Sequence, residues 1–284
     1  MSQVQLDYRV PAEDLQPFVT LFYHFRADVS VFEDAERADH AQLRFRLDDG
    51  TAVYSFPDGS TQFAGAIHVI GPTSGVMHVR AGGPVDVLGM GLQPAGWEAL
   101  LGIDASAMLN RVLDGVEAFG ARAAPARAAI QAAVGTQARI DAAEAFVRAA
   151  IGAGASTALA FSRRIDAWLA DSPSPDVEEL VAATGLSRRQ VERRCNALYG
   201  APPKLLARKY RALRAAVALA SGSATLDALI GEGFYDQSHL IRELKQFTGC
   251  TPRQLRESPG QLARLTMDGR RALGGQVHPI VSDT

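Results

Sequence analysis

Cysteine is scarce in this sequence, because the chain of 284 residues has only two, Cys195 and Cys250. Two cysteines so far apart do not make a disulfide framework or a zinc ribbon, which agrees with a reducing compartment. No run of about 18 uninterrupted apolar residues is present, so we expect no helix that crosses a membrane. The first residues, Met-Ser-Gln-Val-Gln-Leu-Asp, also lack the basic and apolar regions of a signal peptide. We therefore expect a cytoplasmic protein.

Recognisable catalytic and metal-binding motifs are lacking as well. Four histidines, His24, His40, His68 and His78, have no close His or Glu partner of the kind that metal sites use. The glycine clusters lack the Lys-Ser/Thr pair that follows a phosphate-binding loop, and no nucleophile-bearing motif occurs. The sequence therefore predicts no metal, no cofactor and no catalytic residues. A small-molecule enzyme built on the N-terminal part is the least favoured alternative.

An overall excess of basic charge is also missing, since the formal net charge is −2 at pH 7. The charges are distributed unevenly, however. Residues 161–257 hold 15 Lys and Arg against 11 Asp and Glu, whereas the remainder holds 14 against 20. Within residues 186–214, nine basic residues face a single acidic one, Glu192. Such a run is often only a solvated surface, but it is also the electrostatic footprint of nucleic-acid binding.

Residues 187–200 return in altered form 49 positions later, at residues 236–249. Both copies carry apolar residues at i, i+4 and i+7, which predicts a short helix with one narrow buried stripe, and a glycine ends each copy. Such a helix offers its other side to a partner, and two at a fixed offset favour a repetitive partner such as duplex DNA. The matched apolar residues are Val191, Cys195 and Leu198 in the first copy and Leu240, Leu244 and Phe247 in the second.

The residues around both copies predict two helix-turn-helix units joined by one helix. In such a unit the second helix enters the major groove of DNA. A linker of roughly 17 residues spans about 25 Å, which is compatible with two recognition helices one groove repeat apart. The predicted helices are 177–184 and 187–200 in the first unit, the linker from Pro203 to about 220, 225–231 and 236–247 in the second unit, and a closing helix from Pro252.

The side of each second helix opposite its apolar stripe carries the side chains that we expect to contact DNA. Arg suits guanine, Asn and Gln suit adenine, and Glu accepts from cytosine. Contacts to phosphate set position rather than sequence. For His239, a stabilising role within its own unit is an equal alternative. The predicted DNA-binding residues are Arg188, Arg189, Glu192, Arg193, Asn196, Gln237, Ser238, His239, Arg242 and Lys245, and the predicted phosphate contacts are Ser187, Lys204, Arg208 and Lys209.

The N-terminal third alternates between short β-like runs and turn sequences such as Asp49-Gly50 and Gly71-Pro72. Six or more short strands at this spacing predict a small barrel or sandwich. The Ala-rich residues 117–170 then predict helices, which form either a connector with a dimer surface or ordinary helices packed beside the barrel. The predicted strands are residues 18–25, 42–46, 52–56, 67–70, 76–79 and 85–92.

Several segments of the chain match a known family pattern. They are residues 180–200, the Pro-Pro-Lys-Leu start of the linker helix, and above all Gly233-Phe-Tyr-Asp-Gln-Ser-His-Leu-Ile-Arg242 with Phe247-Thr-Gly-Cys-Thr-Pro252. Over about 100 residues the chain thereby resembles the DNA-binding domain of AraC/XylS-type bacterial transcription regulators. More weakly, Phe56-Pro-Asp-Gly59, Ile70-Gly-Pro72 and residues 89–97 resemble a branch of that family with a cupin-like sensory domain.

The resemblance implies an α+β chain with an N-terminal small cupin-like β-barrel, a helical connector and a C-terminal all-α domain of two helix-turn-helix units. It implies a sequence-specific transcription regulator that binds double-stranded DNA, responds to a small-molecule effector or partner, and forms a homodimer, with RNA polymerase as a further candidate partner. We expect the sensory domain at residues 1–115, the connector and candidate dimer surface at 116–160, the DNA-binding domain at 161–258 and a tail at 259–284.

Two positions in each unit depart from the family pattern. Val181 and Leu229 stand where the family usually has a small residue, and Cys195 and Leu244 stand where it usually has an aromatic one. We expect the two departures to compensate in volume, so that both units keep their fold. The alternative is that an altered helix crossing weakens DNA docking, which would make the chain a protein-interaction module with impaired DNA binding.

Overall fold

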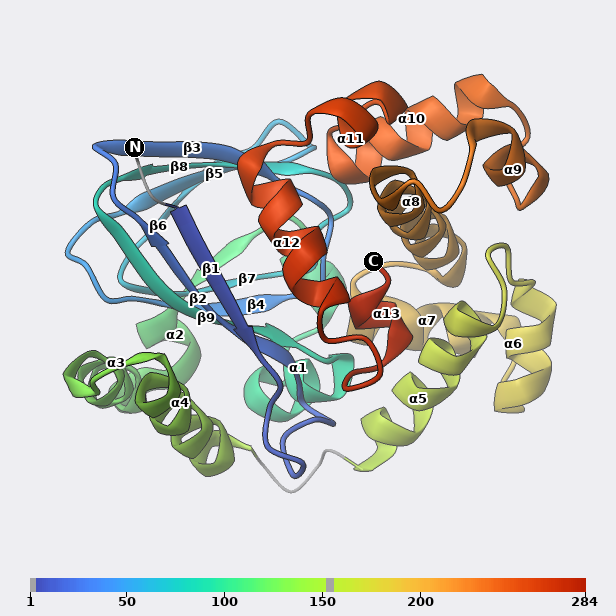
Figure 1. Cartoon of the computed structure of the whole chain (residues 1–284). Helices are drawn as coiled ribbons and strands as arrows, with labels where there is room; N and C mark the ends of the chain where they lie inside the picture. Colours follow the sequence, from blue (N-terminus) through green and yellow to red (C-terminus); the bar gives the residue numbers. More distant parts are fainter. Residues whose placement is uncertain (1–3, 152–155) are drawn as a thin grey trace.

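The computed structural model describes residues 4–151 and 156–284 and shows a β-rich N-terminal part followed by a helical part (Figure 1). This order of elements confirms the α+β class expected from the sequence. Within the described residues, no helix combines the length and the apolar character that a bilayer crossing requires.

The described strands pair antiparallel and group into two sheets. The larger sheet has the order β1-β2-β9-β4-β7-β10 and the smaller one the order β3-β8-β5-β6. Their inner faces share an apolar core that contains Phe25, Tyr54 and Val79. The strands are β1 (Val4–Arg9), β2 (Val19–Ala27), β3 (Val31–Glu36), β4 (Gln42–Arg46), β5 (Ala52–Ser55), β6 (Thr61–Ala64), β7 (Ile67–Ile70), β8 (Met77–Gly82), β9 (Val85–Leu92) and β10 (Val112–Asp114).

Every segment expected as a strand contains one, but β1, β3, β6 and β10 are additional. Each of the four lacks the signal that reveals a strand. The sequence of β3, Val-Phe-Glu-Asp-Ala-Glu, is acidic, and β1 is only partly buried along its length, so neither shows a clean apolar alternation. The other two are four and three residues long.

Strand β4 is buried on both of its faces. Because side chains alternate along a strand, Leu43 and Phe45 join the core under the helices, whereas Gln42, Arg44 and Arg46 point into the space between the two sheets. The polar half of this alternation therefore lines the interior of the protein instead of its surface.

Helices cover the outer face of the larger sheet (Figure 1). Trp97, Phe119 and Phe146 from these helices share one apolar core with β4 and β9. For residues up to 150, this arrangement agrees with helices packed beside the sheet. A dimer surface on them stays a prediction. The elements are α1 (Pro94–Leu101), the 3₁₀ helix η1 (Ala105–Met108), α2 (Gly115–Phe119), the 3₁₀ helix η2 (Gly120–Arg122), α3 (Ala123–Ala132) and α4 (Thr136–Ala150).

The C-terminal helices begin and end at the sequence signals for capping. Ser187 and Gln190 form a capping box at the start of α7, and Asp236 accepts a hydrogen bond from a backbone N–H at the start of α10. Gly200 and Gly249 end these two helices at positive φ, which glycine adopts without strain. The helices are α5 (Ser156–Asp171), α6 (Val177–Thr184), α7 (Arg188–Tyr199), α8 (Pro203–Ser221), α9 (Leu226–Gly231), α10 (Gln237–Thr248), α11 (Pro252–Glu257), α12 (Gln261–Arg271) and α13 (Pro279–Ser282).

Two of these helices, α12 and α13, lie in the region expected as a tail. Helix α12 contacts β1 and β3, which are the edge strands of the two sheets, and it therefore spans the gap between them (Figure 1). The backbone N–H of Leu262 donates to Asp34 at 3.1 Å. Gly269 lies so close to Tyr8 that a β-carbon would come within 2.6 Å of the ring. The C-terminal segment thus fastens the helical part to the sheets.

Candidate DNA interface and interdomain cavity

Helix α7 presents a basic face to solvent. Its apolar stripe is fully or almost fully buried, as expected for the second helix of a helix-turn-helix unit. On the other side Arg188, Arg189 and Arg193 are exposed, and Glu192 and Asn196 are partly buried beside them. Arg188 forms an ion pair with Glu178 of α6.

Helix α10 presents a mixed polar face in the second unit. Leu240, Leu244 and Phe247 are completely buried. Opposite them the side chains of four predicted DNA-binding residues are exposed: Gln237, Ser238, Arg242 and Lys245. The fifth, His239, is held inside its own unit, because its Nδ1 accepts a hydrogen bond from the backbone N–H of Tyr235 at 3.1 Å and its ring lies edge-on to Phe234. The stabilising alternative for His239 therefore has support in its contacts.

The four predicted phosphate contacts have different surroundings. Ser187 and Lys204 are exposed. Arg208 is half-exposed and donates to Glu243 of α10 at 2.6 Å, so it ties the linker helix to the second unit. Lys209 is a correction: its side chain is buried, and its Nζ lies 3.4 Å from the backbone carbonyl of Asp39 in the sheet domain. In this arrangement Lys209 cannot reach a phosphate.

Tyr235 is a surface residue that the sequence reasoning does not include among the DNA contacts. Its side chain is 90% exposed. The residue directly precedes Asp236, which caps α10. Its ring is therefore open to solvent beside the N-terminal end of α10. The signal was present as an aromatic residue within the Gly-Phe-Tyr-Asp turn.

The residues that depart from the family pattern lie in the cores of the two units. Cys195 is fully buried and Val181 packs against the same apolar cluster, while Leu229 and Leu244 share the cluster of the second unit. The larger and smaller residues of each unit can compensate in volume only if they lie in the same core. That the two departures offset each other in stability stays a prediction. Burial raises the pKa of Cys195 to about 12, so that its thiol stays protonated.

Helix α8 sets the separation of the two units. Its 19 residues span about 28 Å at 1.5 Å per residue, slightly more than the sequence suggests. Arg214 fixes α8 to α5 by donating to the carbonyls of Leu169 at 2.7 Å and Ser172 at 3.0 Å. The linker helix therefore packs as part of a continuous helical domain.

The sheet domain contacts the C-terminal ends of both recognition helices. Gly200, which ends α7, lies against Pro72. At the end of α10, the backbone N–H of Ala38 donates to the Phe247 carbonyl at 2.7 Å. The N–H of Val76 donates to the Gln246 carbonyl at 2.8 Å. A shift of the sheet domain would therefore change contacts at both helix-turn-helix units.

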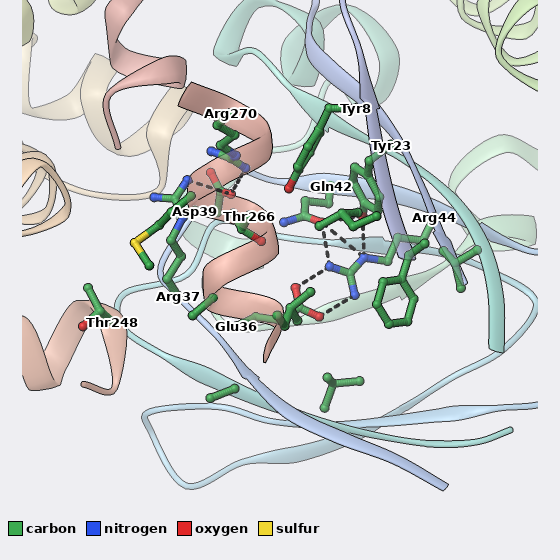
Figure 2. A pocket seen from close by; sticks show the side chains of 18 of the residues that line it. Tyr8, Tyr23, Glu36, Arg37, Asp39, Gln42, Arg44, Thr248, Thr266 and Arg270 are labelled. Atoms are coloured by element: carbon green, nitrogen blue, oxygen red, sulfur yellow. Dashed lines mark hydrogen bonds and ion pairs between the residues drawn. The ribbon is translucent and has the colours of Figure 1, made fainter. Parts of the chain in front are cut away.

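A cavity of about 110 Å³ lies between the two sheets and the C-terminal helices (Figure 2). Most of its lining is apolar, and junctions of this kind between domains are common ligand sites. In the described part of the chain, no three His, Cys, Asp or Glu side chains gather in a way that would hold a metal ion. The apolar lining includes Leu6, Phe25, Val79 and Val87 from the sheets and Leu213, Val217, Leu262 and Met267 from the helices.

Arg44 lies at the sheet side of the cavity, and its guanidinium group is fully paired (Figure 2). Two of its nitrogens donate to the two oxygens of Glu36, at 2.9 and 2.5 Å. The remaining donors reach the hydroxyl groups of Tyr23 and Tyr54 and the amide oxygen of Gln42. Burial raises the pKa of Tyr54 and Arg44 acts against it, and the net shift is upward. This buried network is satisfied without any added group.

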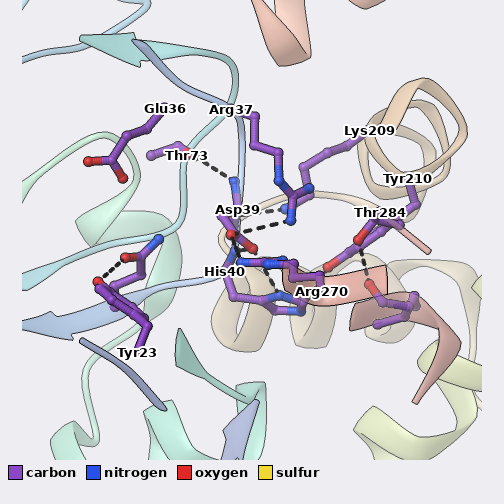
Figure 3. Close-up of polar contacts among 12 residues, drawn as sticks. Tyr23, Glu36, Arg37, Asp39, His40, Thr73, Lys209, Tyr210, Arg270 and Thr284 are labelled. Atoms are coloured by element: carbon purple, nitrogen blue, oxygen red, sulfur yellow. Dashed lines mark hydrogen bonds and ion pairs between the residues drawn. The ribbon is translucent and has the colours of Figure 1, made fainter. Parts of the chain in front are cut away.

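A second polar cluster joins the β3–β4 connection to the helices (Figure 3). Asp39 pairs with Arg270 of α12 at 2.5 Å, and Lys209 of α8 approaches its backbone carbonyl. The neighbouring His40 contacts the hydroxyl of Tyr210 through Nε2 at 2.7 Å. Burial lowers the pKa of His40, so this ring is neutral near pH 7.

Arg37 forms an ion pair in this cluster but no hydrogen bond to the described residues. Its Nη2 lies 3.5 Å from Asp39, but none of its three guanidinium nitrogens donates a hydrogen bond within the described residues, and all three are buried. Burial, and then the positive charge of Arg270, lower the pKa of Arg37 to about 10, which leaves it charged at neutral pH. Burial alone would raise the pKa of Asp39, but Arg270 and Arg37 hold it well below its usual range.

Two known domain families match separate parts of the chain. Residues 180–258 match a helix-turn-helix domain family, and residues 8–114 match a domain of unknown function, DUF6597. Helices α12 and α13 lie beyond both matches. No curated protein sequence matches the chain.

Among solved structures, the chain is similar to ToxT of Vibrio cholerae. ToxT of strain SCE256 with an unsaturated fatty acid bound gives a TM-score of 0.45 at 10% identity, over 82% of this chain and 94% of ToxT. ToxT of strain O395 gives a TM-score of 0.43 at 8% identity, over 82% and 96%.

Proposed function

We propose, from the AraC-type helix-turn-helix domain that residues 180–258 form, that this chain is a sequence-specific DNA-binding transcription regulator. The observation that carries the proposal is the pair of capped recognition helices, α7 and α10, whose polar faces are exposed while one linker helix holds both. Arg189, Arg193 and Arg242 are free to approach base edges from these faces.

Control by a small molecule is part of the proposal, and the cavity between the domains supports it. Residues of both domains line this cavity. A ligand there would gain or lose contacts whenever the sheet domain and the helical domain change their relative position. Only such a difference in contact lets a ligand shift a conformational equilibrium.

The finer parts of the proposal concern assembly and location. We expect a cytoplasmic homodimer, with α3 and α4 as candidates for the dimer surface, and contact with RNA polymerase at regulated promoters. Catalysis is not part of the proposed role. Sedimentation of the full chain with and without DNA tests the homodimer. If the chain sediments as a monomer on DNA, the homodimer prediction is wrong, whereas the DNA-binding proposal still stands.

Selection of bound fragments from genomic DNA tests the DNA-binding proposal. We expect enrichment of a site with two blocks about one helical turn apart, since two recognition helices on a linker of this length reach successive major grooves. A variant with Arg189→Ala, Arg193→Ala and Arg242→Ala serves as the control and should lose the enrichment. If the unaltered chain binds fragments with no preference in sequence, the proposal is wrong, and the protein-interaction alternative takes its place.

A further inference from the structure

We propose that the C-terminal segment 261–284, which holds α12 and α13, is a brace that presets the positions of the two recognition helices for DNA. The segment follows residues 180–258, so it lies outside the helix-turn-helix family match. The inference rests on the proposed function where it concerns DNA. The brace itself follows from the packing of the segment in the structure.

The first argument is that one segment enters the cores of both helix-turn-helix units. Helix α12 contributes Met267 to the apolar core of the second unit, which also contains Leu244. Helix α13 contacts α5 and contributes Ile280 and Val281, each 2% exposed, to the apolar cluster that contains Val191 of the first unit (Figure 1). The segment therefore connects the two units independently of the linker helix α8.

The second argument is that the chain between α12 and α13 is held in place. The backbone N–H of Gln276 donates to the carbonyl of Leu273 at 3.0 Å, and the N–H of Gly274 donates to that of Arg271 at 3.0 Å. Leu273 and Val277 pack against the cluster of the first unit. A connection fixed in this way transmits the position of α12 to α13.

The third argument is that the brace is anchored on a fixed frame. Leu262 donates its backbone N–H to Asp34 of β3 at 3.1 Å, and Arg270 pairs with Asp39 at 2.5 Å. Because α8 joins the units at one side and the brace joins them at another, rotation of one unit about the axis of α8 is restrained. A single linker helix leaves that rotation free.

The fourth argument is that the docked brace leaves the DNA-facing side chains open. Arg189 and Arg193 on α7 and Gln237 and Arg242 on α10 are exposed in this arrangement. A segment that inhibited DNA binding by covering the recognition helices would bury them. The exposure therefore favours a presetting role.

Presetting matters because the two units bind DNA in sequence. Once one unit has bound its block, the other finds its own block at an effective concentration that depends on how well the spacing is fixed. A rigid arrangement also loses less conformational freedom on binding. The brace should therefore raise the affinity for a two-block site and sharpen the preference for one spacing, without changing how either unit reads its own block.

A slack connection between α12 and α13 tests this role. The variant carries a four-residue Gly-Ser-Gly-Ser insertion after Gly275, in an exposed turn, so that both helices keep their own contacts. In anisotropy titrations its affinity for the selected two-block site should fall about fivefold, while its affinity for each single block should change less than about twofold. The penalty for five extra base pairs between the blocks should also shrink about threefold.

The control is the same insertion after Gly59, in the exposed turn between β5 and β6, which should change none of these affinities. An equal loss for single-block and two-block sites would show a merely structural role and overturn the inference, as would an unaltered preference for spacing. If the insertion variant does not fold, Ile280→Ala should show the same split between the sites. Ile280→Val, which keeps most of the side chain, should then restore the unaltered behaviour.

A measurement without DNA tests the brace itself. Spin labels on Glu179→Cys of α6 and Asp227→Cys of α9 report the distance between the units from exposed positions, in a chain with Cys250→Ser and with the fully buried Cys195 left in place. Double electron–electron resonance should give a narrow distance distribution, and the insertion after Gly275 should broaden it about twofold, since it frees rotation about α8. An unaltered width overturns the brace.

The two proposals fail separately. A distribution that broadens in a chain with no sequence preference in DNA keeps the brace and removes the regulator. A distribution that does not change in a chain that binds its selected site removes the brace and leaves the regulator.

Discussion

Removing the charge of Asp39 should destabilise the protein strongly, because this carboxylate pairs with Arg270 and Arg37 in a largely buried cluster. The change is Asp39→Asn, which keeps the size of the side chain. In the structure Asp39 is 14% exposed, lies 2.5 Å from Arg270 and accepts the backbone N–H of His40 at 2.8 Å. Breaking a buried ion pair by removing one partner costs about 3–5 kcal/mol. The slight exposure places the expected loss near the lower end, at about 3 kcal/mol.

The control for this prediction is an exposed pair on the same strand region. Glu33 on β3 pairs with Arg80, and the two side chains are 62% and 68% exposed. Surface ion pairs contribute about 0–1 kcal/mol, so Glu33→Gln should change the free energy of unfolding by less than about 1 kcal/mol. The assay is urea unfolding of the full chain, followed by fluorescence of Trp97 in the sheet-domain core and Trp168 in the helical domain.

A further outcome of the Asp39→Asn experiment follows from the same charges. The low pKa of Asp39 in the folded chain means that its contribution is present above its unfolded value of 3.8 and is lost as the pH falls through the folded value. The variant should therefore lack this part of the acid sensitivity. If Asp39→Asn is as stable as Glu33→Gln, the reasoning about the buried ion pairs of Asp39 is refuted.

Three other predictions test the pH-sensitive groups and the sorting of DNA contacts. Burial lowers the pKa of Lys209 from 10.5 to about 8, so the unfolded chain binds more protons than the folded chain between these pH values. The free energy of unfolding should therefore rise with pH in this range, by up to about 3 kcal/mol. In urea titrations the rise should vanish in Lys209→Met, and a rise that persists in this variant would contradict the buried position of Lys209. Burial raises the pKa of Asp166 from 3.8 to about 7, so its stabilising contribution is complete below the unfolded value and is lost as pH rises through 7. At pH 8, Asp166→Asn should therefore be more stable than the unaltered chain, and thermal unfolding would measure the difference. In anisotropy titrations at several salt concentrations, Lys204→Ala should weaken binding to all DNA sequences alike and reduce the salt slope by about 1, and a sequence-dependent loss would place Lys204 at a base instead.

The DNA-binding part was predictable from the sequence because its signals are local. Capping residues such as Ser187 and Asp236 and the i, i+4, i+7 stripes depend only on neighbours within a few turns, and they place α7 and α10 correctly. The prediction that Lys209 contacts phosphate was wrong because the surroundings of this side chain are not local in the sequence. Its surroundings include Asp39, which is 170 residues away in the sequence, and no local pattern distinguishes it from an exposed lysine.

The cavity was not predictable, because its chemistry arises where distant segments meet. The alternation in β4 reads as a half-exposed strand, yet its polar residues Gln42, Arg44 and Arg46 face the interior. Arg37 and Arg270 are separated by more than 200 positions and come together only when α12 crosses the edges of both sheets. One signal was available: the charged residues Glu36, Arg37 and Asp39 lie shortly before the core strand β4, where charged residues are rarely buried without a reason.

The most direct test of the central claim is a binding measurement that pairs each recognition helix with one block of the selected DNA site. Anisotropy titrations would compare the intact site with sites in which one block is scrambled, for the unaltered chain, Arg189→Ala and Arg242→Ala. We predict that scrambling either block weakens the unaltered chain, and that each variant becomes insensitive to one block while remaining sensitive to the other. If both variants lose affinity equally for every site, the two helices do not read separate blocks of DNA, and the account of this protein as a two-unit DNA-binding regulator is contradicted.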